Sequence, residues 1–250
     1  MVEAILHGCG GAMGRVITEL AASDSEIKIV AGVDKNPVQV GEYPVYGSLS
    51  ECPKADVVID FSTAKAVDGL LAYCEETKTA VVLCTTGLSD EQLLNVKKLG
   101  ETAAVLRSAN MSVGINLLFK VLKEVAPTLA AAGFDIEIVE KHHNRKIDAP
   151  SGTAIALADA INESMDNAYH YKYDRHSTRE KREKTEIGIQ AVRGGTIVGE
   201  HDVIFAGQDE VITFQHTAYS RAIFANGAIQ AAKFLKGKGP GMYSMADVIG

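Results

Sequence analysis

The chain has 250 residues, of which 46% are hydrophobic, and a formal net charge of −7 at pH 7. This length accommodates one large or two modest domains with a sizeable core, and the acidic balance argues against nonspecific binding to nucleic acid or to an acidic membrane surface. No apolar run approaches the length of a membrane span and the apolar run at the start is too short for a signal peptide, so we expect a cytoplasmic protein.

The four cysteines are scattered along the chain, at Cys9, Cys52, Cys74 and Cys84. Their spacing fits neither a zinc ribbon nor a redox-active pair separated by two residues. Thiols stay reduced in the cytoplasm, where disulfides are rare. We therefore expect free thiols and no metal site.

A strand, a glycine-rich turn and a helix open the chain. Residues 4–8 predict a short buried strand, and the turn Gly8-Cys9-Gly10-Gly11-Ala12-Met13-Gly14 precedes apolar residues at helical spacing. Glycines let such a turn close and let phosphates approach the backbone, while the helix N-terminus supplies N–H groups and a favourable dipole. The spacing departs from G-x-G-x-x-G, because Met13 stands at the last glycine position. We interpret the turn as a pyrophosphate cradle; a plain tight turn is the alternative.

The second predicted strand, residues 27–33, ends at Asp34 and Lys35. Asp34 lies about where dinucleotide-binding folds place the acid that accepts hydrogen bonds from the ribose, roughly 20 residues beyond the glycine turn. A solvated carboxylate at a strand end is the alternative. Because the glycine turn precedes it, we favour ribose contact.

Strands and helices continue to alternate as far as residue 132. The apolar patterns predict strands at 56–61, 80–84 and 103–106, and helices at 64–76, 90–99 and 113–132, which together indicate a doubly wound parallel sheet. Ligands of such sheets bind beyond the carboxyl ends of the strands. We therefore expect residues 61–63 and 84–87 to line the nicotinamide side of a cofactor site and 108–111 to serve as cofactor contact and hinge. Ordinary helix capping is the alternative for Ser62 and the preferred interpretation for Ser89.

A different pattern begins at Phe134, where residues 135–140 alternate polar and apolar as a half-buried strand does. This strand leads into a cluster of proton donors, namely His142, His143, Arg145 and Lys146. Ser151 suits the N-cap of the following helix. Position 154 holds Ala rather than the Glu or Gln of a capping box, so we expect the N–H groups near Gly152 and Thr153 to bind an anion.

The remaining segments complete a second, smaller α+β domain. Residues 172–186 carry many charges of both signs and predict an exposed, mobile connection. Strands are predicted at 188–192, 197–205 and 210–219, in a mixed or antiparallel sheet with helices on one face. A final helix from Arg221, with a broad apolar stripe, should pack back on the first domain. The expected division is residues 1–111 with 222–250 for a Rossmann-type dinucleotide-binding domain, and 112–221 for substrate binding and oligomerisation.

Residues 140–154, Glu-Lys-His-His-Asn-Arg-Lys-Ile-Asp-Ala-Pro-Ser-Gly-Thr-Ala, closely resemble the signature of the 4-hydroxy-tetrahydrodipicolinate reductase (dihydrodipicolinate reductase) family. The similarity extends over nearly the whole chain. Further matching motifs are the 8–14 turn, Asp60-Phe61-Ser62, Thr85-Thr86-Gly87, Ala109-Asn110, and Arg221 with Phe224-Ala225-Asn226-Gly227.

The resemblance implies an enzyme of the diaminopimelate route to lysine that reduces a cyclic, hydroxylated imine dicarboxylate with loss of water. It implies that His142 and Lys146 handle the proton. The substrate would be held by His143, Ser151, Gly152, Thr153 and Arg221. The cofactor would be contacted by Gly8, Cys9, Gly10, Gly11, Ala12, Met13, Asp34, Lys35, Cys84, Thr85, Thr86, Ser108, Ala109, Asn110 and Met111. Cys84 stands where the family has glycine, so the backbone approach there differs slightly.

Two further expectations concern the cofactor and the assembly. Asp34 favours the ribose hydroxyls of NADH, whereas Lys35 can meet the extra phosphate of NADPH, so we predict use of both with a modest bias toward NADH. The strands within 188–219 and the family resemblance predict a homotetramer assembled through the second domain.

Two other classes of function compete with this hypothesis. The first is a thiol catalyst resembling semialdehyde dehydrogenases, with Cys84 as the nucleophile, although no histidine is fixed near it by sequence. The second is a noncatalytic NAD(H)-sensing regulator, which would need a DNA-binding module or a partner surface that the sequence does not show.

Overall fold

The computed structural model describes residues 1–250, which fold into two compact units. The first unit contains residues 1–113 and 221–250, and the second contains residues 114–220. The chain therefore leaves the first unit once and returns to it with its last 30 residues. None of the helices combines the length and the apolar character that a membrane span requires.

The first unit is built on a seven-stranded sheet with the order β12-β6-β5-β4-β1-β2-β3. All of its neighbouring strands run parallel. The strands are β1 (Val2–His7), β2 (Ile27–Val33), β3 (Val45–Tyr46), β4 (Val57–Asp60), β5 (Ala80–Leu83), β6 (Ala104–Leu106) and β12 (Gly241–Tyr243). The order reverses between β1 and β4, which creates the crevice where such folds bind ligands. The predicted doubly wound fold is confirmed.

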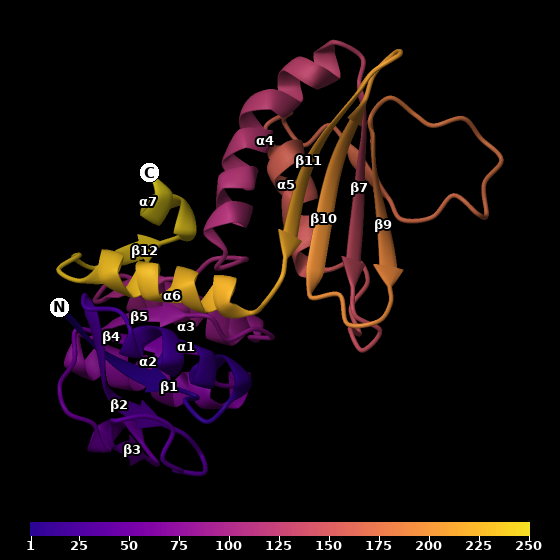
Figure 1. The fold of residues 1–250 in the computed structure, drawn as a ribbon. Coiled ribbons are helices and arrows are strands. Elements are labelled where there is room, and N and C mark those ends of the chain that lie inside the picture. Colours follow the sequence, from indigo (N-terminus) through magenta and orange to yellow (C-terminus); the bar gives the residue numbers. More distant parts are fainter. The chain divides into compact units, whose positions relative to one another are not determined.

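Helices cover both faces of this sheet (Figure 1). The helices are α1 (Ala12–Ala22), α2 (Ala64–Thr77), α3 (Asp90–Leu99), α6 (Ala222–Leu235) and α7 (Met245–Ile249). Strand β1 shows why two layers are needed, because Ala4 and Leu6 pack with α1 and α6 while Ile5 packs with α2 and α3. A strand buried on both faces reads as a continuous apolar run. As expected, the final long helix packs on the first unit.

Several short elements were not predicted from the sequence. Strands β3 and β12, the 3-10 turn η1 (Leu49–Glu51) and helix α7 have between two and five residues each. Such lengths are too short to show a hydrophobic period.

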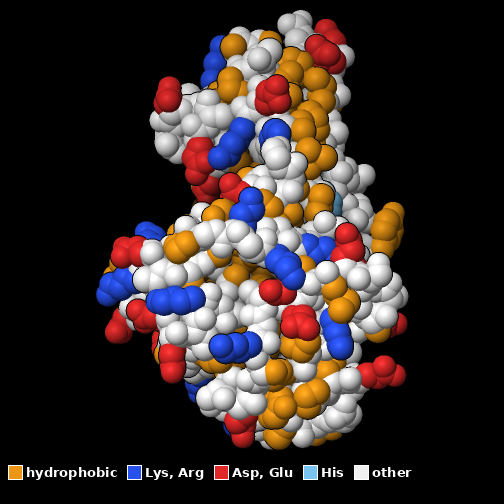
Figure 2. Space-filling view, turned by 90° about the vertical axis from the view of Figure 1, so that its left-hand side faces the viewer, with side chains coloured by type: hydrophobic (Ala, Val, Ile, Leu, Met, Phe, Trp, Pro, Cys, Tyr) orange, Lys and Arg blue, Asp and Glu red, His pale blue; other side chains and the backbone are white.

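On the face drawn in Figure 2, acidic and basic side chains are interspersed, so this face presents no extended surface of one charge.

The second unit has a five-stranded mixed sheet with the order β11-β10-β7-β9-β8. Its strands are β7 (Asp135–His142), β8 (His170–Lys172), β9 (Glu186–Arg193), β10 (Gly199–Ala206) and β11 (Val211–Ala218). Helices α4 (Val113–Ala131) and α5 (Gly152–Glu163) lie on one side of this sheet (Figure 1). Their apolar residues, Leu122 and Leu157 among them, form one core with β7, β9 and β10. The expected sheet with helices on one face is confirmed.

The connection predicted at 172–186 is exposed over most of its length, as expected, but it is more closely tied to the sheet than predicted. Its first residue ends β8 and its last begins β9, and the charged segment between them is anchored to the sheet. The Arg182 side chain is only 16% exposed, and its guanidinium donates hydrogen bonds to Glu137 Oε1 at 2.8 Å and to the Ile136 carbonyl at 2.8 Å. Arg175 pairs with the buried Glu186 in the same segment. The composition of the segment indicates its charge. It does not indicate that the guanidiniums of Arg175 and Arg182 lie against carboxylates of neighbouring strands.

Candidate active site

The glycine turn joins the carboxyl end of β1 to the start of α1. Gly8 has a φ of +82°, a region that favours glycine, and its N–H donates to the Val33 carbonyl at 2.8 Å. A Cβ at Gly14 would lie 2.4 Å from the Gly8 carbonyl oxygen. Gly14 is thus the glycine that lets the helix pack against the turn, which explains why Met13 is tolerated one position earlier.

The predicted ribose-reading acid lies beside this turn. Asp34 Oδ2 accepts a hydrogen bond from the Gly10 N–H at 3.0 Å, and Oδ1 accepts one from the Asn36 N–H at 3.2 Å. Both Asp34 and the exposed Lys35 line a cavity of about 330 Å³ together with Gly8, Gly11, Ser62 and Thr63. No side chain caps the N-terminus of α1, whose N-cap residue is Gly11. A glycine turn, an uncapped helix and an acid at one cavity fit the pyrophosphate and ribose of a dinucleotide.

A buried pair of titratable side chains, His7 and Asp60, lies at the same crevice. These are the last residues of β1 and β4, they lie opposite each other in the parallel register, and His7 Nδ1 is 2.8 Å from Asp60 Oδ1. Burial raises the pKa of Asp60, but hydrogen bonds with His7, Ser62 and Thr85 outweigh burial and hold it below its ordinary value. Neither residue was predicted to have a role, although each ends a buried strand.

The turns that follow β4 and β5 meet above this pair. Ser62 N–H donates to Asp60 Oδ1 at 3.2 Å, and the hydroxyls of Ser62 and Thr85 are 3.4 Å apart. The structure therefore brings together the two turns that the sequence placed on the nicotinamide side. Ser89 instead caps α3 in a capping box with Gln92, as preferred from the sequence.

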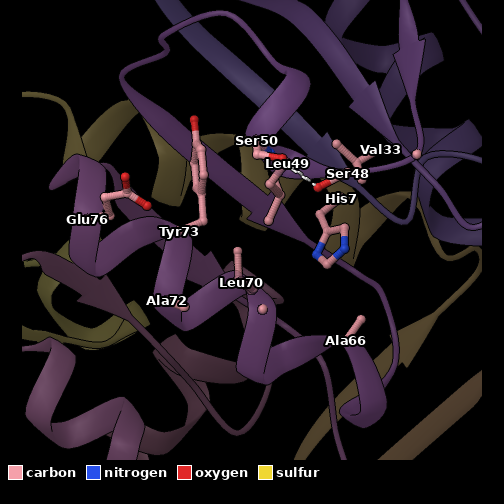
Figure 3. Close-up of a pocket in the computed structure, with 12 residues that line it drawn as sticks. His7, Val33, Ser48, Leu49, Ser50, Ala66, Leu70, Ala72, Tyr73 and Glu76 are labelled. Atoms are coloured by element: carbon pink, nitrogen blue, oxygen red, sulfur yellow. Dashed lines mark hydrogen bonds between the residues drawn. The ribbon is translucent and has the colours of Figure 1, made fainter.

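A second cavity, of about 340 Å³, continues from His7 toward α2. It shares His7, Val33 and Ala66 with the first cavity. Figure 3 shows the His7 ring between the segment that carries Ser48 and helix α2. The two cavities together extend the crevice away from the glycine turn, along the side of the sheet where β2 and β3 end.

Cys84 follows β5 as predicted, but its thiol is poorly suited to be a nucleophile. Burial raises the pKa of Cys84 well above its ordinary value, and the nearby Asp60 carboxylate raises it further. A thiolate is the reactive form, so this setting opposes the thiol mechanism.

All four cysteines are free. No group of three or more His, Cys, Asp or Glu side chains in the structure is placed to hold a metal ion.

The other expected cofactor residues follow β5 and β6 in the first unit. Thr85 is buried and Thr86 exposed. Residues 108–111 lead from β6 to α4; the Asn110 side chain accepts a hydrogen bond from the Ser112 N–H at 2.8 Å. The Met111 side chain is buried in the core of the first unit. Arg221, the one expected substrate residue in this unit, stands at the N-cap of α6.

The second unit assembles the cluster of proton donors at the end of β7. This strand runs two residues further than predicted, and its buried positions alternate through Ile136, Ile138, Glu140 and His142. Glu140 and His142 therefore project toward the same side as the apolar core. Glu140 is fully buried, and His142 is 8% exposed.

Every polar contact of the Glu140 carboxylate comes from a group that can donate a hydrogen bond. Oε2 lies 2.6 Å from His142 Nδ1 and Oε1 lies 2.9 Å from the Ser151 N–H. Arg193, on β9, donates to both oxygens at 2.7 Å. Burial raises the pKa of Glu140, and the hydrogen bonds with Arg193, His142 and Ser151 more than reverse this, so the carboxylate is ionised at neutral pH.

His142 is surrounded by further charged and titratable groups. Burial lowers the pKa of His142, Glu140 raises it, and Lys146 and Arg193 lower it further. The net shift is downward. The His201 ring, on β10, stands edge-on to His142 with 5.2 Å between centroids, and burial lowers the pKa of His201 to about 4. His201 is therefore neutral at pH 7.

The loop after β7 places Lys146 near this cluster. Lys146 Nζ forms an ion pair with Asp148 Oδ1 at 2.8 Å, and its side chain is 21% exposed. The Lys146 N–H donates to the His143 carbonyl, which closes a turn. Arg193 also donates to the Asp148 carbonyl at 2.6 Å, so the loop is held to β9.

The start of α5 confirms the predicted N-cap. The Ser151 hydroxyl accepts a hydrogen bond from the Ala154 N–H at 3.1 Å and lies 3.0 Å from His201 Nε2. Ser151 is 2% exposed, so its hydroxyl is used within the protein. Gly152 and Thr153 form the first turn of the helix, where a dipole favours an anion.

Glu140, Arg193 and His201 belong to this cluster, although the sequence predicted a role for none of them. The alternating pattern of residues 135–142 could have placed Glu140 on the buried face with His142. No local pattern marked Arg193 or His201, because they reach the cluster from β9 and β10.

Two family models cover nearly the entire chain. The model described as dihydrodipicolinate reductase, N-terminus, matches residues 2–111, and the one described as dihydrodipicolinate reductase, C-terminus, matches residues 114–249. The chain belongs to the dihydrodipicolinate reductase family. It is therefore an oxidoreductase that uses NADH or NADPH.

Individual members of the dihydrodipicolinate reductase family are similar over their full lengths. The 4-hydroxy-tetrahydrodipicolinate reductase of Caldanaerobacter subterraneus subsp. tengcongensis is 53% identical over 250 residues, which are 100% of this chain and 98% of that one. The enzyme of the same name from Clostridium botulinum is 49% identical over 252 residues, 100% of this chain and 99% of that one.

Solved structures agree with this assignment. The dipicolinate-bound dihydrodipicolinate reductase from Paenisporosarcina sp. TG-14 has a TM-score of 0.80 and 25% identity, with coverage of 100% of this chain and 99% of that one. An amine dehydrogenase from Mycobacterium smegmatis has a TM-score of 0.65 at 11% identity, covering 98% of this chain and 95% of that one, so it shares the fold alone.

Proposed function

We propose that the protein reduces 4-hydroxy-tetrahydrodipicolinate to tetrahydrodipicolinate, with loss of water, in the cytoplasmic diaminopimelate route to lysine. The observation that carries the proposal is the cluster of His142, Lys146 and the α5 N-terminus at the end of β7. It places a histidine, a lysine ammonium and a helix N-terminus within one segment of the second unit.

The first unit would hold the cofactor. Its glycine turn and uncapped α1 would bind the pyrophosphate, and Asp34 would accept hydrogen bonds from the ribose. The adjoining cavity beside His7 and α2 offers room for the adenosine end. When bound, the nicotinamide supplies the hydride, so the protein itself needs no redox-active side chain.

The second unit would hold and protonate the substrate. Gly152 and Thr153 at the start of α5, with His143 in the preceding loop, would bind carboxylates of the cyclic imine. His142 or Lys146 would deliver the proton that completes reduction. Both groups belong to residue types that act as general acids near neutral pH when their surroundings adjust the pKa.

The reaction itself is tested by supplying the freshly formed imine to the purified protein with NADH or NADPH and following nicotinamide absorbance. Oxidation of the cofactor only when the imine is present is the expected result. A protein that binds NADH tightly but never oxidises it in the presence of the imine would be a sensor instead.

Cofactor choice depends on Lys35, because its ammonium can offset the repulsion between Asp34 and the 2′-phosphate of NADPH. We expect Lys35→Ala to weaken NADPH binding several-fold more than NADH binding, since an exposed ion pair contributes about 1 kcal/mol. Dissociation constants for both cofactors measure the effect, with Lys28→Ala, near the start of the strand that precedes Lys35, as the control. Equal weakening of the two cofactors by Lys35→Ala would show that Lys35 does not read the phosphate.

We also propose a homotetramer assembled through the sheet of the second unit. The support is that helices cover one side of this sheet, while apolar side chains of β9 and β11 remain exposed, Val192 by 45% and Val211 by 63%. Exposed apolar strands usually find cover in an assembly. Light scattering at micromolar concentration should give the mass of four chains, and a monomeric mass would contradict the proposal.

A further inference from the structure

The fully buried Glu140 carboxylate is the centre of a hydrogen-bond network that joins three parts of the second unit. It contacts His142 on its own strand, Arg193 on β9, and the backbone N–H of Ser151 at the start of α5. Arg193 in turn holds the Asp148 carbonyl, which lies in the loop that carries Lys146. One carboxylate thus links His142 and the loop that carries Lys146 to the N-terminus of α5.

The chemistry of this network requires a carboxylate. An ionised carboxylate only accepts hydrogen bonds, whereas an arginine and a backbone N–H only donate. With two Arg193 nitrogens and the Ser151 N–H as donors, the remaining contact at 2.6 Å is satisfied when His142 Nδ1 carries a proton. A side-chain amide at position 140 would direct its NH2 group at one of these donors.

Fixing the Nδ1 proton determines what the other ring nitrogen can do. In neutral His142, Nε2 is then the acceptor, and after protonation Nε2 is the donor that is not committed to Glu140. Gly199, the first residue of β10, keeps this nitrogen uncrowded, because a Cβ there would lie 3.1 Å from Nε2. The network therefore directs the exchangeable proton of His142 to Nε2.

We propose that Glu140, held in place by Arg193, is a positioning residue that fixes the Nδ1–H tautomer of His142 and aligns it with the start of α5. This inference rests on the proposed role of His142 in proton transfer. If Glu140 has this role, the protonation of His142 must depend on the charge at position 140. An ion pair with a purely structural role would not impose this dependence.

The test is Glu140→Gln, which keeps size and removes charge. The groups that face His142 are Glu140 on β7, Arg193 on β9, His201 on β10 and Lys146 in the loop. Of these, Glu140 alone is an anion, and loss of an adjacent anion lowers a histidine pKa by about 1 unit or more. Nuclear magnetic resonance of the labelled His142 ring should therefore show its titration at lower pH.

Kinetics provide the second measurement for this variant. We expect kcat to fall about a hundredfold, the loss typical of a displaced proton donor, while the dissociation constant for NADH is unchanged. Glu200→Gln is the matched control, because Glu200 lies on the adjacent strand β10 and pairs with Lys141 rather than with the network. It should leave both kcat and the His142 titration unchanged.

The outcomes separate this inference from the proposed function. If His142→Ala loses turnover while Glu140→Gln keeps both kcat and the His142 titration, the positioning role is wrong and the proton-transfer role stands. If His142→Ala retains turnover, the proton-transfer role itself is wrong.

The unmodified protein provides a measurement that does not depend on the folding of any variant. Nitrogen-15 spectra of neutral His142 should show the proton on Nδ1. A predominant Nε2–H tautomer would overturn the inference.

Discussion

Lys146→Ala and His142→Ala are each expected to lower kcat about a hundredfold or more, with little change in NADH affinity. Both side chains lie in the second unit, whereas the glycine turn and Asp34 that would hold the cofactor lie in the first. Loss of either group should therefore slow protonation of the substrate and leave binding of the dinucleotide unchanged. Steady-state kinetics with the imine, together with NADH titration by fluorescence, separate the two effects.

Lys141→Ala is the matched control for these variants. Lys141 adjoins His142 in sequence, but its ammonium pairs with Glu200 and Asp202, both at 3.0 Å, away from the buried Glu140. Turnover should survive this change. Near-normal turnover in both Lys146→Ala and His142→Ala would refute the assignment of proton transfer to this cluster.

Gly14→Ala is expected to destabilise the first unit and to abolish most NADH binding. The added Cβ would lie 2.4 Å from the Gly8 carbonyl oxygen and 2.5 Å from that of Cys9. These are backbone atoms of the turn itself, so the clash can be relieved only by moving α1 away from it. Overpacking of this kind costs about 1–3 kcal/mol. Urea unfolding measures the loss of stability, and NADH titration measures the loss of the cradle.

Gly239→Ala provides the comparison, because a Cβ at Gly239 meets no atom within 4 Å and its φ is not positive. This variant should match the parent in both stability and NADH affinity. If Gly14→Ala bound NADH as the parent does, the turn between β1 and α1 would not be the pyrophosphate site.

Much of the fold followed from the sequence because its signals are local. The strand at residues 27–33 and the helix at residues 90–99 were predicted with the bounds that the structure shows. An apolar period of two or of 3.6 residues is complete within one element. The glycine turn and the Ser151 cap are local in the same sense, since a turn and a helix start are specified by a few adjacent residues. Residues 140–154 indicated the family for the same reason, because the signature consists of adjacent residues.

The partners of the buried charges were decided only by the tertiary structure. Strand register places Arg193 of β9 opposite His142, and its guanidinium reaches the Glu140 carboxylate, 53 residues earlier in the chain. Strand register likewise places His7 opposite Asp60. Each of these pairs lies roughly 50 to 60 residues apart in the chain, so no local period could reveal it. Burial makes such partners necessary, because an isolated charge in a core is strongly unfavourable, but the sheet topology determines which residue becomes the partner.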